Sequence, residues 1–232
     1  MVFCYFCVII IVNRNLISVE NIGFLFDLDG VLIDSEREYS KIWAIINREY
    51  PTGVENLEQV IKGCTLEKIL NDYFPDKKLQ QKVSTRLHYL ENLMHYEYLP
   101  GAKEFIDELS SKNLKKALVT SSDNEKMNHL REEIPELMNS FDFIVTANLV
   151  TESKPSPQGY LLGAKKIGRE IQKCVVFEDS LQGVMAGKNA GAYVVGIYGT
   201  LPAETLAPFS DMIIGSLSEI NLNSLIPILK SK

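Results

Sequence analysis

The chain has 232 residues, of which 46% are hydrophobic and 23% charged, and its formal net charge at pH 7 is -6. This length suits one large domain or a core with a smaller insert, and it is long enough to bury a sizeable core. Binding to nucleic acid or to an anionic membrane requires a positive electrostatic field. A chain with a net negative charge does not supply such a field overall, so we expect neither partner. A phosphate ester could still bind in a locally positive pocket.

The four cysteines are few and scattered, which predicts a protein of a reducing cytoplasm and not a disulfide scaffold. Cys4 and Cys7 form a C-x-x-C pair, but the chain has no second pair to complete a zinc site. Residues 1–12 are almost wholly apolar, yet this stretch is too short to span a bilayer. We interpret residues 1–18 as an N-terminal extension, either an edge segment packed on the core or an over-long start of the reading frame.

The first chemical motif is Asp27-Leu28-Asp29-Gly30, which follows the apolar run 22–26. The run carries bulky side chains on both faces, which is typical of a strand covered on both sides in a parallel sheet. If the extended chain continues, Asp27 and Asp29 point to the same side and could address one ligand. Gly30 then allows a sharp turn. A simple turn that ends a strand is the alternative interpretation.

The pattern of residues 36–98 indicates helices and loops without strands, because their apolar residues recur at spacings of three and four. The pattern predicts helices over 36–50, 57–61, 66–73 and 76–98. Leu99-Pro100-Gly101 marks the return to the main domain. We therefore expect a helical domain of residues 34–99 inserted into a core made of residues 1–33 and 100–232.

From residue 102 onward, apolar runs alternate with amphipathic stretches. The predicted strands cover 116–120, 141–146, 174–177, 193–197 and 212–214, and the predicted helices cover 102–112, 124–131, 157–167, 180–190 and 222–229. Such alternation implies βα units and a parallel sheet. The predicted fold class is α/β: a Rossmann-like three-layer core with a parallel sheet, plus the inserted all-helical domain.

Three further polar clusters close apolar runs or open helices. Thr120-Ser121-Ser122-Asp123-Asn124 offers hydroxyls at a helix N-terminus, Lys154 precedes a proline-rich turn, and Glu178-Asp179 ends a buried run. Ligand sites in parallel sheets lie beyond the carboxyl ends of the strands, where all of these clusters fall. Each cluster alone could be a helix cap or a solvated loop.

Taken together, the clusters supply acids, a cation and a hydroxyl. Carboxylates that converge on one point repel one another and need a cation, and hard oxygen ligands suit Mg²⁺. Phosphoryl transfer requires a metal, groups that hold the phosphate oxygens, and an aligned nucleophile, and a carboxylate can be that nucleophile. The sequence therefore predicts phosphoryl-transfer chemistry.

With these motifs in this order, the chain resembles phosphatases of the haloacid dehalogenase superfamily, in the β-phosphoglucomutase-like group with a helical cap. The resemblance implies that Asp27 is the nucleophile and that Asp29 protonates the leaving oxygen and later activates water. It also implies that Thr120 and Lys154 bind phosphate. The metal ligands implied are Asp27, the Asp29 backbone carbonyl, Asp179 and Glu178. Ser121 and Asn124 are further candidates for phosphate binding.

The departures from the group favour hydrolysis. Relatives that are dehalogenases lack the second aspartate, whereas this chain has Asp29. The mutases resembled here carry an arginine clamp for a second phosphate, where this chain has Leu66. We expect a Mg²⁺-dependent phosphatase of a small, sugar-like phosphate that works as a monomer. A sugar phosphomutase is the first alternative and a non-catalytic phosphometabolite-binding protein is the second. The candidate residues for substrate recognition in the insert are Tyr39, Trp43, Lys62 and Thr65.

Overall fold

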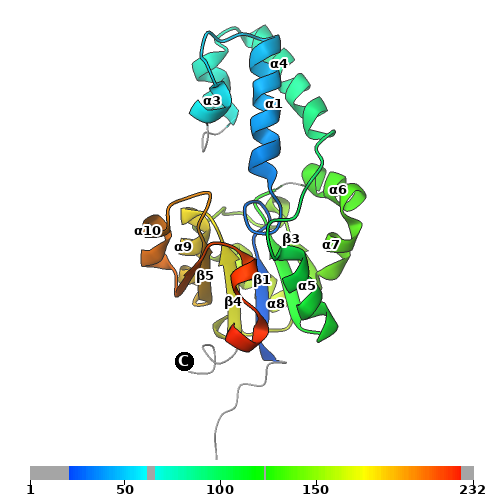
Figure 1. The fold of residues 1–232 in the computed structure, drawn as a ribbon, viewed down its shortest axis with the longest axis vertical. Helices are drawn as coiled ribbons and strands as arrows, with labels where there is room; N and C mark the ends of the chain where they lie inside the picture. Colours follow the sequence, from blue (N-terminus) through cyan, green and yellow to red (C-terminus); the bar gives the residue numbers. More distant parts are fainter. Residues whose placement is uncertain (1–20, 62–65, 123, 226–232) are drawn as a thin grey trace, which may run out of the picture.

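The computed structural model describes residues 21–61, 66–122 and 124–225. Within these ranges, six strands form one parallel sheet in the order β3-β2-β1-β4-β5-β6 (Figure 1). The strands are β1 (Gly23–Phe26), β2 (Lys115–Val119), β3 (Phe143–Val145), β4 (Cys174–Glu178), β5 (Tyr193–Ile197) and β6 (Met212–Ile214). The strand that carries the first motif therefore lies in the middle of the sheet, between β2 and β4.

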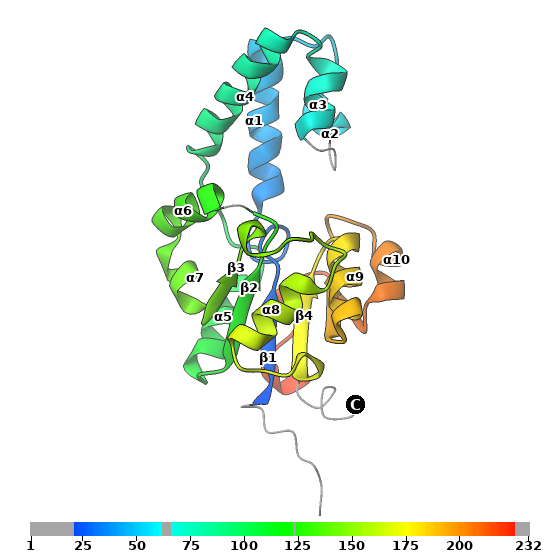
Figure 2. The same ribbon diagram turned by 180° about the vertical axis from the view of Figure 1, so that it is seen from behind.

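Five helices lie in the chain between β1 and β2, and the first four of them project away from the sheet as a separate column (Figures 1 and 2). These four are α1 (Ser35–Glu49), α2 (Leu57–Val60), α3 (Leu66–Tyr73) and α4 (Lys77–Glu91). We call residues 34–99 the helical insert. The remaining helices are α5 (Ala102–Ser111), α6 (Asn124–Glu133), α7 (Pro135–Ser140), α8 (Gln158–Lys166), α9 (Leu181–Ala190) and α10 (Ala203–Leu206).

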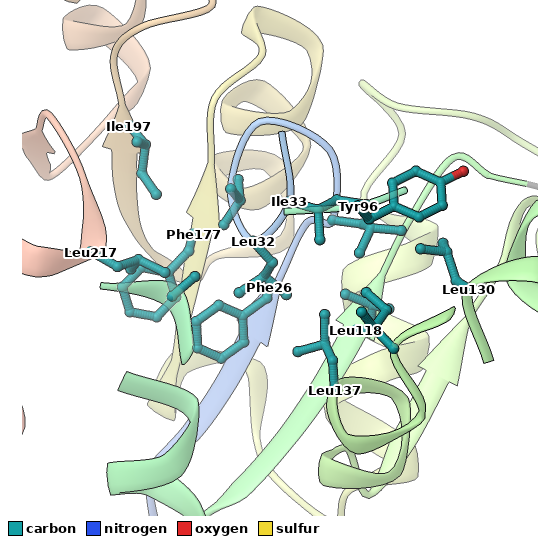
Figure 3. Packing of buried hydrophobic residues seen from close by; sticks show 14 of the residues in the cluster. Phe26, Leu32, Ile33, Tyr96, Leu118, Leu130, Leu137, Phe177, Ile197 and Leu217 are labelled. Carbon is teal, nitrogen blue, oxygen red and sulfur yellow. The ribbon is translucent and has the colours of Figure 1, made fainter. Parts of the chain in front are cut away.

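Side chains that alternate along β1 enter two different hydrophobic layers. Phe24 and Phe26 pack in the layer that includes Phe105 of α5, whereas Leu25 packs in the layer that includes helices α8 and α9. Phe26 also stacks on Phe177 of β4, with ring centroids 4.6 Å apart and an interplanar angle of 8° (Figure 3). Helices thus cover both faces of the sheet, and the predicted α/β fold class is confirmed.

The prediction of one long helix over 76–98 is wrong. Helix α4 ends at Glu91, and the following chain returns to the core beside the segment that leaves it. There the N–H of Asp34 donates to the Glu97 carbonyl at 3.0 Å, and the N–H of Leu99 donates to the Leu32 carbonyl at 3.0 Å. This pairing replaces helical hydrogen bonds, so tertiary contacts override the apolar spacing that continues through this region.

Two other elements differ from the predictions. The predicted strand over 141–146 is shortened to β3, and helix α7, which opens with Pro135, precedes it. Pro at the first helical positions is favourable, since its missing N–H would have no helical partner. Of the predicted helix over 222–229, residues 222–225 are helical and the rest lie outside the described residues, as do residues 1–18, Lys62 and Thr65.

None of the helices in the described part of the chain combines the length and the apolar character needed to cross a bilayer.

Candidate active site

Most of the candidate site residues lie at the carboxyl ends of the central strands. Asp27 follows β1, Thr120 follows β2, and Glu178 is the last residue of β4. The N–H of Asp27 donates to the carbonyl of Phe177 at 3.0 Å, which continues the pairing of β1 with β4. The sheet therefore brings the carboxylates of the first and fourth strands to one place.

Lys154, in the segment before α8, joins these two strand ends. Its Nζ lies 2.6 Å from Asp27 Oδ1 and 2.5 Å from Glu178 Oε1, and only 13% of its side chain is exposed. Burial lowers the pKa of Lys154, but the charges of Asp27 and Glu178 outweigh it and hold this pKa above its ordinary value. The lysine therefore remains an ammonium ion beside the proposed nucleophile.

Glu178 is fully buried, and both of its carboxylate oxygens accept hydrogen bonds. Oε1 accepts from the Tyr160 hydroxyl at 2.9 Å as well as from the lysine. Oε2 accepts from the N–H groups of Asp179 and Ser180 at 3.0 Å and from Ser180 Oγ at 2.9 Å. Helix α9 starts so close that a Cβ on Gly183 would lie 1.7 Å from Oε1, so this position requires glycine.

Asp27, Glu178 and Asp179 form a buried acidic cluster whose ligand oxygens lie within 4.8 Å of one another. Burial raises the pKa of Asp27 well above its ordinary value, and the neighbouring acids add to this rise while Lys154 opposes it. Burial and the Glu178 charge raise the pKa of Asp179 to about 7. A divalent cation would relieve this repulsion, and a set of hard oxygen donors fits Mg²⁺.

Asp29 lies on the side of the site that faces the helical insert, and its carboxylate is not part of that cluster. Both of its oxygens accept from Lys126 Nζ, at 2.7 and 2.8 Å, and one also accepts from Ser122 Oγ at 3.2 Å. Burial raises the pKa of Asp29, but the Lys126 charge and these hydrogen bonds outweigh it and lower the pKa below its ordinary value. Asp29 is therefore a carboxylate in this arrangement.

The candidate phosphate ligands are only partly gathered at the site. Thr120 is buried, and its Oγ1 accepts from the N–H of Ser122 at 3.0 Å, which leaves the hydroxyl hydrogen to donate to an anion. Asn124 is turned to another neighbour, because its amide oxygen accepts from Thr146 Oγ1 at 3.1 Å. An amide contacts a phosphate through its N–H groups and not through its oxygen, so a phosphate contact by Asn124 stays a prediction.

Two cavities lie near the carboxyl ends of the central strands, lined by residues other than Asp27. One, of about 370 Å³, lies between the insert and the core and is lined by residues that include Asp29, Tyr39 and Lys126. The other, of about 280 Å³, is lined by residues that include Thr120 and Lys154. Ser121 lines both cavities.

The residues of the insert that line the larger cavity are only partly those that the sequence analysis predicted for substrate recognition. Tyr39 lines the larger cavity, but Trp43 is buried in the hydrophobic cluster that also contains Phe26. The cavity is also lined by His88, Glu91 and Asn92, at the end of α4, which the sequence pattern assigned to the middle of a longer helix.

Sequence reasoning also missed Lys126 and Tyr160. Both stand on helices, where a lysine is ordinarily a solvated side chain and a tyrosine at helical spacing is ordinarily part of the core. The signal available for Lys126 was its place one turn after the hydroxyl cluster at 120–122.

The chain belongs to the haloacid dehalogenase-like hydrolase family, whose sequence profile matches residues 24–197. It is 32% identical over 205 residues to hexitol phosphatase A of Escherichia coli (strain K12), covering 86% of this chain and 93% of that protein. It is 33% identical over 185 residues to a phosphorylated carbohydrates phosphatase of Thermotoga maritima, covering 76% of this chain and 84% of that protein. The predicted family and the enzyme class, a phosphoric monoester hydrolase, are confirmed.

Solved structures share the whole fold. A haloacid dehalogenase family hydrolase of Deinococcus radiodurans superposes with a TM-score of 0.76 at 22% identity, covering 91% of this chain and 98% of that chain. The β-phosphoglucomutase of Clostridium difficile superposes with a TM-score of 0.69 at 21% identity, covering 90% of this chain and 97% of that chain. At this level of identity the likeness establishes the fold alone.

Proposed function

We propose that the protein is a Mg²⁺-dependent phosphatase that hydrolyses a small, sugar-like phosphate monoester through an aspartyl phosphate on Asp27. The observation that carries this proposal is the contact of buried Asp27 with Lys154, 2.6 Å apart, beside two further acids. Both curated relatives described above are named as phosphatases, and their names refer to hexitols and carbohydrates. These names support a polyhydroxylated leaving group.

The reaction divides into two half-reactions. In the first, an Asp27 oxygen attacks phosphorus and the bond from phosphorus to the leaving oxygen breaks, while Asp29, after taking up a proton from solvent, gives this proton to the leaving oxygen. In the second, water attacks the phosphoryl group, Asp29 accepts the proton of the water, and Asp27 leaves as inorganic phosphate forms. Lys154 and Thr120 hold the phosphoryl oxygens in both steps.

The acidic cluster would hold the metal. Asp27, Glu178 and Asp179 supply carboxylate oxygens, and the family resemblance adds the backbone carbonyl of Asp29. When bound, Mg²⁺ would offset the charge of the phosphoryl group and of the acids around it. Lys154 serves the same purpose from the protein side, since its ammonium already contacts two of the acids.

The helical insert, residues 34–99, would act as a cap that closes over the larger cavity and excludes bulk water. Tyr39 enters that cavity from α1, while His88, Glu91 and Asn92 line it from the end of α4 and the residue after it. Side chains that both donate and accept hydrogen bonds suit the hydroxyl groups of a sugar or polyol. All of these residues belong to one chain, which supports a monomeric enzyme.

The test is a phosphatase screen over sugar, nucleotide and glycolytic phosphates, with and without Mg²⁺, on the wild type and on Asp27→Asn. We expect the variant to lose turnover, because an amide cannot form the aspartyl phosphate. The matched control is Asp34→Asn, which changes an N-cap acid that accepts from the Arg37 N–H at 3.1 Å and keeps a residue that caps well. Full activity of Asp27→Asn would overturn the mechanism.

A sugar phosphomutase is the second candidate, because the fold is shared with a β-phosphoglucomutase. Against it, Leu66 stands where the resembled mutases carry an arginine, and its side chain packs against the hydrophobic cluster that contains Trp43. Without that arginine a bisphosphate intermediate lacks a bidentate clamp. Glucose 1-phosphates with a bisphosphate primer should yield only inorganic phosphate, and formation of an isomeric sugar phosphate would favour the mutase.

A further inference from the structure

Lys126 is a charged residue at the centre of the site that neither the motifs nor the proposed mechanism assigns a role. It stands in the first turn of α6, and 17% of its side chain is exposed. Its Nζ lies 2.7 and 2.8 Å from the two oxygens of Asp29, so one ammonium group spans the whole carboxylate. Since Asp29 is the proposed general acid and base, this contact with Lys126 helps to determine the orientation of the Asp29 carboxylate.

The position of Lys126 is fixed from both the core and the insert. It belongs to a helix of the core, and its Nζ also lies 5.5 Å from the ring centroid of Tyr39, which belongs to α1 of the insert. Such a ring attracts the ammonium group, and the attraction grows when water is excluded. Lys126 is thereby held between Tyr39 on one side and Asp29 on the other.

The carboxylate of Asp29 is held apart from the acidic cluster. Ser122 Oγ donates to it at 3.2 Å from the loop after β2, and Lys126 contacts it from the helix that follows this loop. The acidic cluster in the described residues consists of Asp27, Glu178 and Asp179. Asp29 is thus directed toward the cavity between insert and core, where the leaving group departs and water must enter.

We propose that Lys126 is a positioning residue that orients the Asp29 carboxylate for the second half-reaction, in which it takes a proton from the attacking water. This inference rests on the proposed aspartyl-phosphate mechanism. The ammonium group contacts both oxygens of Asp29, at 2.7 and 2.8 Å, and so fixes the orientation of the carboxylate. Because proton transfer requires hydrogen-bond reach to the water, a carboxylate that swings freely would act less often.

The experiment compares wild type, Lys126→Met, Lys126→Arg and Arg131→Met with p-nitrophenyl phosphate. Methionine keeps the length of the side chain and removes the charge, while arginine restores a cation. Arg131 stands on the same helix and contacts Asn128 away from the site, so it is the matched control. Thermal unfolding of each variant checks that the fold is retained.

We expect Lys126→Met to lower kcat by about 10- to 100-fold, because hydrolysis of the aspartyl phosphate becomes rate-limiting. The value of kcat/KM, which reports on formation of the intermediate, should change far less. Rapid mixing should then show a burst of about one equivalent of p-nitrophenol per active site. Lys126→Arg should recover part of kcat, and Arg131→Met should behave as wild type.

Other outcomes overturn the inference in distinguishable ways. An equal fall in kcat and kcat/KM without a burst would mean that Lys126 acts in the first half-reaction or only in folding. A rise in KM with unchanged kcat would mean that Lys126 binds substrate. A higher kcat in Lys126→Met would mean that the lysine restrains Asp29. Absence of phosphatase activity in the wild type would instead refute the proposed function.

Discussion

Tyr160 donates its hydroxyl hydrogen to Glu178 Oε1, the same oxygen that accepts a hydrogen bond from Lys154. The Lys154 Nζ also lies 5.3 Å from the centroid of the Tyr160 ring. Tyr160 is fully buried on α8 and is one of the largest side chains of its hydrophobic layer. One residue therefore fills the core and supports the lysine beside the proposed nucleophile, Asp27.

Replacing Tyr160 by Phe should weaken this support while keeping the volume of the ring. We expect the free energy of unfolding to fall by about 1–2 kcal/mol, because a hydrogen bond to a buried carboxylate is lost. Turnover should fall by up to about tenfold if a similar energy is lost in the transition state. Urea unfolding and steady-state kinetics measure the two effects. Tyr89→Phe, at an exposed tyrosine of the insert, is the control, and equal behaviour of both variants would contradict the role of Tyr160.

Gly183→Ala adds only one methyl group, but we expect it to lower both stability and activity strongly. The added Cβ would lie 1.7 Å from Glu178 Oε1, so the carboxylate or the start of α9 must move. Overpacking of this kind costs about 1–3 kcal/mol of stability, and displacement of Glu178 should lower activity by about 100-fold. The melting temperature and kcat report these effects. Gln182→Ala, at the exposed neighbouring position on α9, should change neither, and a fully active Gly183→Ala would show that Glu178 need not be fixed.

Magnesium binding should depend on pH through Asp179. Its pKa of about 7 means that a proton competes with the cation when the pH falls below that value. Since the ligand must be ionised, the affinity for Mg²⁺ should decrease toward acid, by at most about tenfold per pH unit, and level off at higher pH. Titration calorimetry between about pH 5.5 and about pH 8.5, in buffers of different ionisation enthalpy, measures both the affinity and the released proton. Constant affinity across this range would refute the assignment.

Asp142 provides a test of acid stability outside the site. Its Oδ1 accepts from Lys115 Nζ at 2.5 Å and its Oδ2 from the N–H of Lys116 at 2.9 Å. Burial raises the pKa of Asp142, but these hydrogen bonds and charges outweigh it, so the folded-state pKa is lower than in the unfolded chain. The stabilisation is therefore complete above the unfolded pKa of about 3.9 and is lost as the pH falls through the folded value.

Asp142→Asn should accordingly be less stable than wild type at neutral pH, and the difference should narrow below about pH 4. Thermal unfolding of both proteins across this range measures the difference. A gap that is independent of pH would mean that the charge of Asp142 contributes nothing.

The residues predicted from the sequence are those whose position follows from strand geometry. Asp27 and Glu178 each end a buried strand, and parallel strands end at one edge, so their approach follows from local pattern alone. Lys154 was expected at the site through the order of motifs. These inferences need only the positions at which the buried strands end, and the apolar runs in the sequence mark those positions directly.

Residues that reach the site from helices could not be placed in this way. Lys126 and Tyr160 owe their roles to how α6 and α8 are rotated against the sheet, which depends on packing between distant segments. The end of α4 was misplaced for a related reason, since Tyr98 pairs with Ile33 across the entrance to the insert. The spacing of apolar residues does not reveal a backbone pairing with a segment some sixty residues earlier in the chain.

That pairing joins the two segments that connect the core and the insert into one narrow two-stranded connection. Asp34 and Leu99 donate their N–H groups across it to the carbonyls of Glu97 and Leu32, each at 3.0 Å. The more than sixty residues of the insert thus connect two paired segments, as a short loop connects the two strands of a hairpin. The insert is therefore attached to the core as a loop is attached to a hairpin, so a change in its length need not alter the strand register that holds Asp27, provided that Tyr39 still contacts Lys126.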